Sequence, residues 1–208
     1  MPTTSPKPDP ATRRERFAWC MYDFANSGYT TVILTAIFNA YFVGVVAADS
    51  GNGHATLLWT LTIAAANYSG AKKRFLVATT LGCVVFTALL SFVGPGDVTL
   101  AMVLVILATV MFASGENLIA AFLPEISPPE TMGRLSGYGW ALGYLGGLLA
   151  LVLCLAYITY AENQGMDASH YVPVSTLIVA MLFGMAALPT LFWLRERSAA
   201  TASIDSAH

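Results

Sequence analysis

The sequence predicts an all-α membrane protein that crosses the bilayer several times. Of its 208 residues, 56% are hydrophobic and only 11% are charged, whereas soluble domains carry about 25% charged residues. Uncharged runs also recur along the chain at the length of a spanning helix, which needs roughly 20 apolar residues. We therefore expect a polytopic helical fold rather than a water-soluble globule.

Five uncharged runs reach or approach that length, and they define the expected spans. The third run continues through Glu116 and Asn117 into further apolar residues, so we expect its helix to run on to residue 123. With their polar flanks, the expected spans cover about residues 22–48, 75–93, 98–123, 137–160 and 172–194.

A sixth apolar segment, residues 57–66, is too short to cross by itself. At 1.5 Å per residue it reaches about 15 Å, half of the roughly 30 Å hydrocarbon core. Extending it to residues 55–70 gives about 24 Å of helix but includes Asn67 and Ser69. Since local bilayer thinning can accommodate such a mismatch, we predict a short second span there.

The basic residues indicate six crossings with both termini in the cytoplasm. Residues 49–56, 94–97 and 161–171 contain no Lys or Arg. If residues 55–70 cross, all ten basic residues lie on one side, and cytoplasmic loops are the ones enriched in Lys and Arg. They are Lys7, Arg13, Arg14, Arg16, Lys72, Lys73, Arg74, Arg134, Arg195 and Arg197.

This topology places a multi-pass membrane domain, residues 17–197, in the inner (plasma) membrane. Residues 1–16 and 198–208 are expected to be disordered cytoplasmic tails because they are polar or rich in proline. A cleaved signal peptide ending near residue 48 is the alternative. Its apolar region of about 21 residues, however, is longer than the usual 7–15.

Composition and motifs argue against several other classes of protein. The net charge of −2 provides no basic field for nucleic acid. The three cysteines lie in apolar surroundings without metal-ligand or disulfide-scaffold spacing. No G-x-S-x-G, H-E-x-x-H or P-loop motif is present. We therefore expect no enzyme, no cofactor and no metal. An intramembrane enzyme that pairs Asp23 with Glu116 is the weaker alternative.

A polar stripe near the start of the first span is a candidate cavity wall. Asp23, Asn26, Ser27 and Thr30 follow the i, i+3, i+4, i+7 rule and share one helix face. A charged side chain in hydrocarbon costs several kcal/mol unless it has a partner or faces water. The stripe therefore predicts a cavity-lining face. The alternative is that Asp23 sits at the interface and helps to cap the helix.

Glu116 and Asn117 form a second polar site, in the fourth span. They lie about seven residues before its cytoplasmic end, roughly 10 Å deep and close to the depth of Asp23. Because a carboxylate is costly there, proton exchange at Glu116 is chemically available. The alternative is that Asn117 and a backbone group satisfy Glu116, which then has only a packing role.

Glycines mark one face of the fifth span. Gly139, Gly143, Gly146 and Gly147 include two small-xxx-small pairs, a pattern that lets helix backbones approach closely. These four residues therefore predict a tight helix–helix contact.

Three stretches together resemble one family. They are residues 19–29 (WCMYDFANSGY), residues 69–75 (SGAKKRF) and residues 117–147, which include FLPEI and GRLSGYGWALGY. The chain, over about residues 16–197, resembles the UMF1-type branch of the major facilitator superfamily, which is related to the vacuolar amino-acid effluxers of autophagy.

The resemblance implies the N-terminal six-helix half of a twelve-helix fold, with a second helix shorter than the family's. It implies a solute site between the halves, with the first and fourth helices lining it. The cavity-lining residues would be Asp23, Asn26, Ser27, Thr30, Glu116 and Asn117.

The second stretch resembles the family's cytoplasmic gating loop, in which Asn67 stands at the place of an aspartate. The resemblance therefore implies a gating role for Asn67, Gly70, Lys72, Lys73 and Arg74, together with Arg134.

In function, the resemblance implies export or efflux of small solutes by alternating access, with amino acids as candidate solutes and protons as a candidate partner. Within the bilayer, the chain would pair with a second six-helix half or self-associate through its glycine-rich fifth helix. The alternative is a non-transporting remnant or accessory membrane subunit.

Overall fold

The computed structural model describes residues 11–46 and 73–195, and every regular element in these ranges is helical. The elements are α1 (Arg13–Tyr29), the π-helical η1 (Thr30–Ala36), α2 (Ile37–Tyr41), the π-helical η2 (Phe42–Val46), α4 (Lys73–Leu89), the 3-10 turn η4 (Leu90–Phe92), α5 (Val98–Ala120), α6 (Leu123–Ile126), α7 (Pro129–Asn163) and α8 (Ala168–Trp193). The predicted all-α class is confirmed.

Within residues 11–46 and 73–195, four helices are long and apolar enough to cross a membrane, judged by length and composition. They are Lys73–Phe92, Val98–Ile126, Pro129–Asn163 and Ala168–Trp193. The polytopic character predicted from the apolar runs is therefore confirmed. The predicted short span at residues 55–70 lies outside the described residues, as do Asn67, Gly70 and Lys72. The count of six crossings thus stays a prediction.

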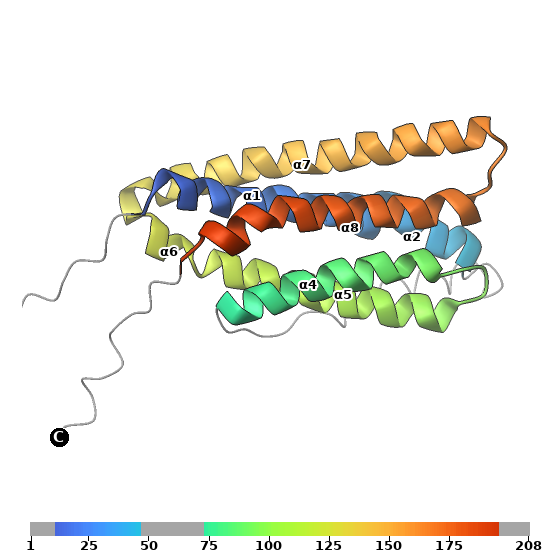
Figure 1. Ribbon diagram of the computed structural model, residues 1–208, viewed down its shortest axis with the longest axis horizontal. Coiled ribbons are helices and arrows are strands. Elements are labelled where there is room, and N and C mark those ends of the chain that lie inside the picture. Colours follow the sequence, from blue (N-terminus) through green and yellow to red (C-terminus); the bar gives the residue numbers. More distant parts are fainter. Residues whose placement is uncertain (1–10, 47–72, 196–208) are drawn as a thin grey trace, which may run out of the picture.

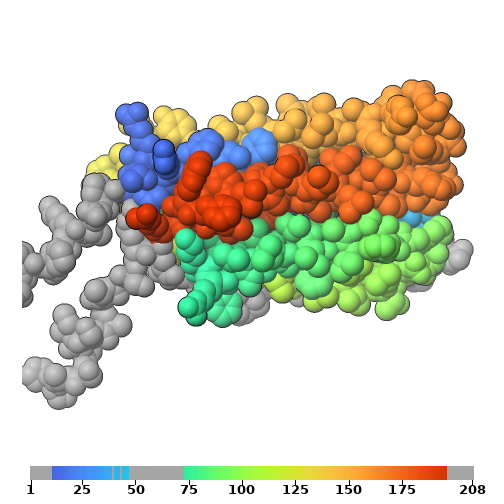
Figure 2. Space-filling model, viewed as in Figure 1, coloured from blue at the N-terminus to red at the C-terminus, as the bar shows by residue number. Residues whose placement is uncertain are grey.

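The helices lie side by side along the long axis of the molecule (Figure 1). α1 packs against α7 and α8, and α4 packs against α5 and α8. The starts of α1, α4 and α7 gather at one end with the last turn of α8, while the α4–α5 and α7–α8 turns lie at the other end (Figure 1). The space-filling view shows this elongated bundle with α8 on the near face (Figure 2).

The basic residues of the described part all belong to segments at one end of the bundle. They are Arg13, Arg14, Arg16, Lys73, Arg74, Arg134 and Arg195. Their segments are the starts of α1, α4 and α7 and the residues that follow α8 (Figure 1). The described Lys and Arg residues, which the sequence confines to alternate connections, thus belong to segments at the same end of the structure.

Buried aromatic residues join α1 to α4 and α5. The Trp19 indole Nε1 donates a hydrogen bond to the Ile119 carbonyl at 2.8 Å. The hydroxyls of Tyr22 and Tyr29 lie 3.1 Å from Thr80 Oγ1 and Thr109 Oγ1, respectively. Such interhelical hydrogen bonds satisfy polar groups that water cannot reach. They fix the rotation of α1 about its axis and so decide which of its residues face α7.

A face of α1 that includes Trp19 and Asp23 meets the glycine row of α7. A Cβ atom at Gly139 would lie 2.9 Å from Asp23 Oδ2, and one at Gly147 would lie 2.8 Å from Thr31 Oγ1. A Cβ at Gly146 would lie 2.8 Å from the carbonyl carbon of Phe24. Without side chains at these positions, the two helices approach closely. Because α1 of the same chain covers this face, self-association through it would require α1 to move away.

Caps and turns extend the helices beyond the apolar runs. Thr12 and Glu15 form a capping box, so α1 begins at Arg13 rather than near residue 22. At the end of α7, the Met166 amide donates to the Ala161 carbonyl and the Gly165 amide to the Glu162 carbonyl. Gly165 has φ +75°, the left-handed conformation that this ending requires. α7 therefore spans 35 residues.

Candidate functional site

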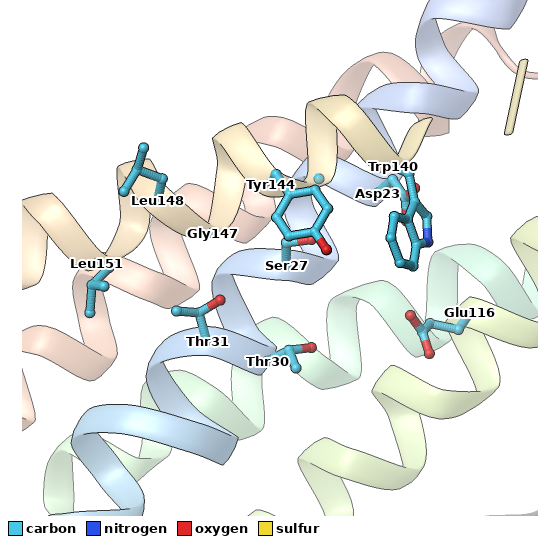
Figure 3. A pocket seen from close by; sticks show the side chains of 11 residues that line it. Asp23, Ser27, Thr30, Thr31, Glu116, Trp140, Tyr144, Gly147, Leu148 and Leu151 are labelled. Carbon is cyan, nitrogen blue, oxygen red and sulfur yellow. The ribbon is translucent and has the colours of Figure 1, made fainter. Parts of the chain in front are cut away.

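A groove of about 470 Å³ opens between α1, α5 and α7. It lies alongside the α1–α7 glycine contact and is shown from close by in Figure 3. Its lining residues are Asp23, Ser27, Thr30 and Thr31 from α1 and η1, Glu116 from α5, and Trp140, Gly143, Tyr144, Gly147, Leu148 and Leu151 from α7.

The geometry of the helices explains why these side chains meet. On α1 and η1 the polar lining residues are spaced four, three and one apart, so they form a single stripe. On α7, Trp140, Tyr144, Leu148 and Leu151 are spaced four, four and three apart and lie beside the glycine row. Close approach of the two helices therefore sets a polar stripe against an aromatic and aliphatic one.

The charge of the groove is entirely acidic. Asp23 is half-buried, Glu116 is exposed, and no Lys or Arg is among the described residues that line the groove. In Figure 3 the Glu116 carboxyl group points from α5 into the space beneath Trp140. Hydroxyl groups of Ser27, Thr30 and Thr31 add hydrogen-bonding capacity. The groove is thus suited to a positively charged or hydrogen-bond-donating ligand.

The aromatic part of the wall is a defined pair. The rings of Trp140 and Tyr144 lie 5.4 Å apart in an edge-to-face arrangement. Both side chains are about two-thirds exposed, at 67% and 68%. Large aromatic side chains that face an acidic groove offer π faces on which a cation can bind.

Four of the six predicted cavity residues line this groove, namely Asp23, Ser27, Thr30 and Glu116. Asn26 and Asn117 do not. Asn26 is buried, and its Oδ1 has no hydrogen-bond partner among the described residues. At about 100° per residue it is rotated about 60° from Asp23, on the side away from Ser27. Asn117 is exposed on α5 outside the groove.

The predicted gating residues that the structure describes lie at the basic end of the bundle. Lys73 and Arg74 begin α4, and Arg134 lies in the second turn of α7. The Lys73 ammonium group donates a hydrogen bond to the main-chain carbonyl of Leu194, just after α8. Lys73 therefore ties the start of α4 to the end of α8, while Arg134 lies on another helix.

The sequence prediction did not include Thr31 or the α7 residues Trp140, Tyr144, Leu148 and Leu151. The four α7 residues lie beside the glycine row at helical spacing, but only the contact of that row with α1 places them at the groove. Within residues 11–46 and 73–195 there is no group of three or more His, Cys, Asp or Glu side chains that could hold a metal ion.

Comparisons with known proteins match this chain to membrane transporters. The family model described as "Vacuole effluxer Atg22 like" matches residues 129–206. An uncharacterized MFS-type transporter of Bacillus subtilis (strain 168), YxiO, is 29% identical over 206 residues, which cover 89% of this chain and 47% of the relative. The chain thus spans about half the length of that relative. No solved structure matches it.

Proposed function

We propose that this chain, a relative of transporters of the major facilitator type, forms one wall of a solute pathway and acts in the export of small solutes by alternating access. The observation that carries the proposal is the acidic groove between α1, α5 and α7, where Asp23 and Glu116 face one space of about 470 Å³. Both transporter matches support the same class of function.

The groove's open side is proposed to face a second set of six helices, in a longer polypeptide or in a separate chain. Transporters of this type bind solute near the midplane, between two structural repeats. The chain covers 47% of the relative's length, which leaves about half of that length for a second set of helices. A pathway completed in this way would place Asp23 and Glu116 at the interface between the halves.

The solute is proposed to carry an ammonium group, as amino acids and amines do. Two carboxylates attract a cation, and the Trp140–Tyr144 pair adds a cation–π surface worth about 0.5–2 kcal/mol. Since no basic lining residue competes for the carboxylates in the described part of the groove, they are free to bind the solute or to exchange a proton. Proton coupling through Glu116 is part of this proposal.

Uptake by inverted membrane vesicles from cells that hold the chain together with its second set of helices tests the solute class. We expect radiolabelled amines and amino acids to be taken up, and alcohols and hydroxy acids of the same size to be rejected. Glu116→Gln should lower uptake by about tenfold or more, which corresponds to about 1.4 kcal/mol, and should remove its pH dependence.

Glu162→Gln is the matched control, because Glu162 is an exposed carboxylate outside the groove, near the end of α7. It should leave uptake unchanged. Equal uptake of the amino compounds and of their hydroxyl analogues would contradict the solute class. If no solute is taken up although the chain is folded, the accessory-subunit alternative is favoured.

The basic end of the bundle is proposed to face the cytoplasm of a cell whose plasma membrane holds the chain. Segregation of the described Lys and Arg residues at that end supports this orientation. A reporter fused after Arg74 is therefore expected to be located in the cytoplasm, where fluorescent protein folds and alkaline phosphatase stays inactive. Active phosphatase at that fusion would show that α4 begins on the outer side.

A further inference from the structure

A second groove, of about 640 Å³, flanks the α1–α7 contact at the basic end of the bundle. It involves a different stripe of α7 from the acidic groove. Arg134, Tyr138, Leu142 and Leu145 line the second groove, whereas Trp140, Tyr144, Leu148 and Leu151 line the first. The glycine row lies between the two stripes on the helix surface. The second groove is therefore separate from the proposed solute pathway.

The outer part of this second groove is basic. Arg13 and Arg16 line it from α1 and Arg134 lines it from α7, and all three side chains are exposed. No carboxylate is among its described lining residues. The hydroxyls of Ser127 and Thr131, 2.9 Å apart, lie in the same lining. Guanidinium groups are donors that proteins use to bind phosphate.

The inner part is apolar. From Arg134, the α7 lining continues through Tyr138 and Leu142 to Leu145, which lies about 16 Å further along the helix. Phe17 contributes from α1. α7 is about 52 Å long at 1.5 Å per residue, much longer than the roughly 30 Å hydrocarbon core. Its first turns therefore reach the headgroup region, while Leu145 reaches acyl-chain depth.

We propose that the second groove binds an anionic phospholipid. Arg13, Arg16 and Arg134 hold the phosphate, and an acyl chain lies along Tyr138, Leu142 and Leu145. The charge of the groove matches the lipid in both sign and depth, since basic pockets between helices on the cytoplasmic side bind anionic headgroups. The bound lipid bridges the starts of α1 and α7, the two helices that also form the acidic groove.

Native mass spectrometry of the full chain in a nonionic detergent tests the proposal, with phosphatidylglycerol and phosphatidylcholine as probes. We expect one phosphatidylglycerol molecule to be retained in preference to phosphatidylcholine. The double variant Arg16→Gln/Arg134→Gln should lower the phosphatidylglycerol affinity by about tenfold or more. Retention of affinity by this variant would overturn the proposal.

The control double variant, Arg14→Gln/Arg195→Gln, removes the same charge from exposed residues that do not line the groove. It should change the affinity by less than about twofold. An equal loss in both double variants would mean that the lipid responds only to net charge, which also overturns the site.

Further controls test whether each variant folds and whether the ligand is a lipid rather than a free phosphate. Circular dichroism and size-exclusion elution report whether each variant folds, and the single variant Arg134→Gln replaces the double variant if that one does not. Glycerol phosphate, which carries the headgroup without acyl chains, should not compete with the lipid. Full competition would assign the groove to a free phosphate and contradict the lipid proposal.

Discussion

Replacing Gly146 with alanine is expected to destabilise the protein by more than about 2 kcal/mol, because overpacking at a closed contact costs about 1–3 kcal/mol and occasionally more. The new Cβ would overlap the main-chain carbonyl oxygen of Phe24 and lie 2.8 Å from its carbonyl carbon. Main-chain atoms of a helix cannot rotate away as a side chain does, so α7 must move off α1. The contacts at Gly139, Gly143 and Gly147 then weaken together.

Gly137→Ala is the matched control on the same helix. A Cβ at Gly137 meets nothing within 4 Å, and alanine favours a helix over glycine by up to about 1 kcal/mol. Thermal unfolding of the purified chain in detergent, followed by circular dichroism, compares the two variants. Gly137→Ala should unfold at or above the temperature of the native chain and Gly146→Ala well below it. Equal unfolding temperatures would contradict the close α1–α7 contact.

Hydropathy was sufficient to predict four of the helices. The apolar runs at residues 75–93, 98–123, 137–160 and 172–194 each lie within a helix long enough to cross a membrane, apart from single residues at their ends. It could not give the full helix lengths, because these depend on backbone caps. The Thr12–Glu15 capping box and the turn at Gly165 lie in polar sequence that an apolar run does not include.

In the first span, hydropathy is insufficient to predict which residues face which neighbouring helix. α1 carries Trp19, Tyr22 and Tyr29, whose polar atoms pair with α4 and α5. These partners are 58 to 100 residues away in sequence, so no local pattern reveals them. Two π-helical stretches, Thr30–Ala36 and Phe42–Val46, also change the helical period. Residues that follow Tyr29, such as Thr31, therefore cannot be assigned to a face from spacing alone.

The candidate site was predictable where its polar residues follow helical spacing on one face of a single helix. Asp23, Ser27 and Thr30 share a stripe, and Glu116 joins them because α5 packs next to α1 at the Trp19–Ile119 hydrogen bond. Trp140 and Tyr144 could not be chosen among the aromatic residues from composition. Only the contact of the glycine row with α1 determines which side of α7 faces the groove.

Water is also expected to fill the acidic groove in the membrane. Thr30 lines the groove near the middle of the helical path from Arg13 to Val46 and is exposed. A cysteine placed there should react with thiol reagents if water reaches it, because only the thiolate reacts and hydrocarbon suppresses its formation. Met181 is the matched position. It is 63% exposed, near the middle of α8, and lines an almost wholly apolar surface groove between α4 and α8.

The native chain gives the background rate of labelling for both cysteine variants, because its own Cys20, Cys83 and Cys154 are buried. Open membrane fragments let an impermeant reagent reach both faces of the bilayer, so neither orientation nor conformation hides a water-filled position. Glu116 provides a further check, since Glu116→Gln removes a charge from the groove without changing its size. That substitution should lower the rate at which a positively charged reagent labels Thr30→Cys relative to the rate for a negatively charged one.

The rate at which an impermeant, positively charged thiol reagent labels Thr30→Cys in native membranes tests the proposed solute pathway most directly. Labelling about a hundredfold faster than at Met181→Cys is the result we expect for a groove that holds water beside Asp23 and Glu116. Equally slow labelling at the two positions would mean that lipid or protein fills the groove, and α1, α5 and α7 could not then form the wall of a solute pathway.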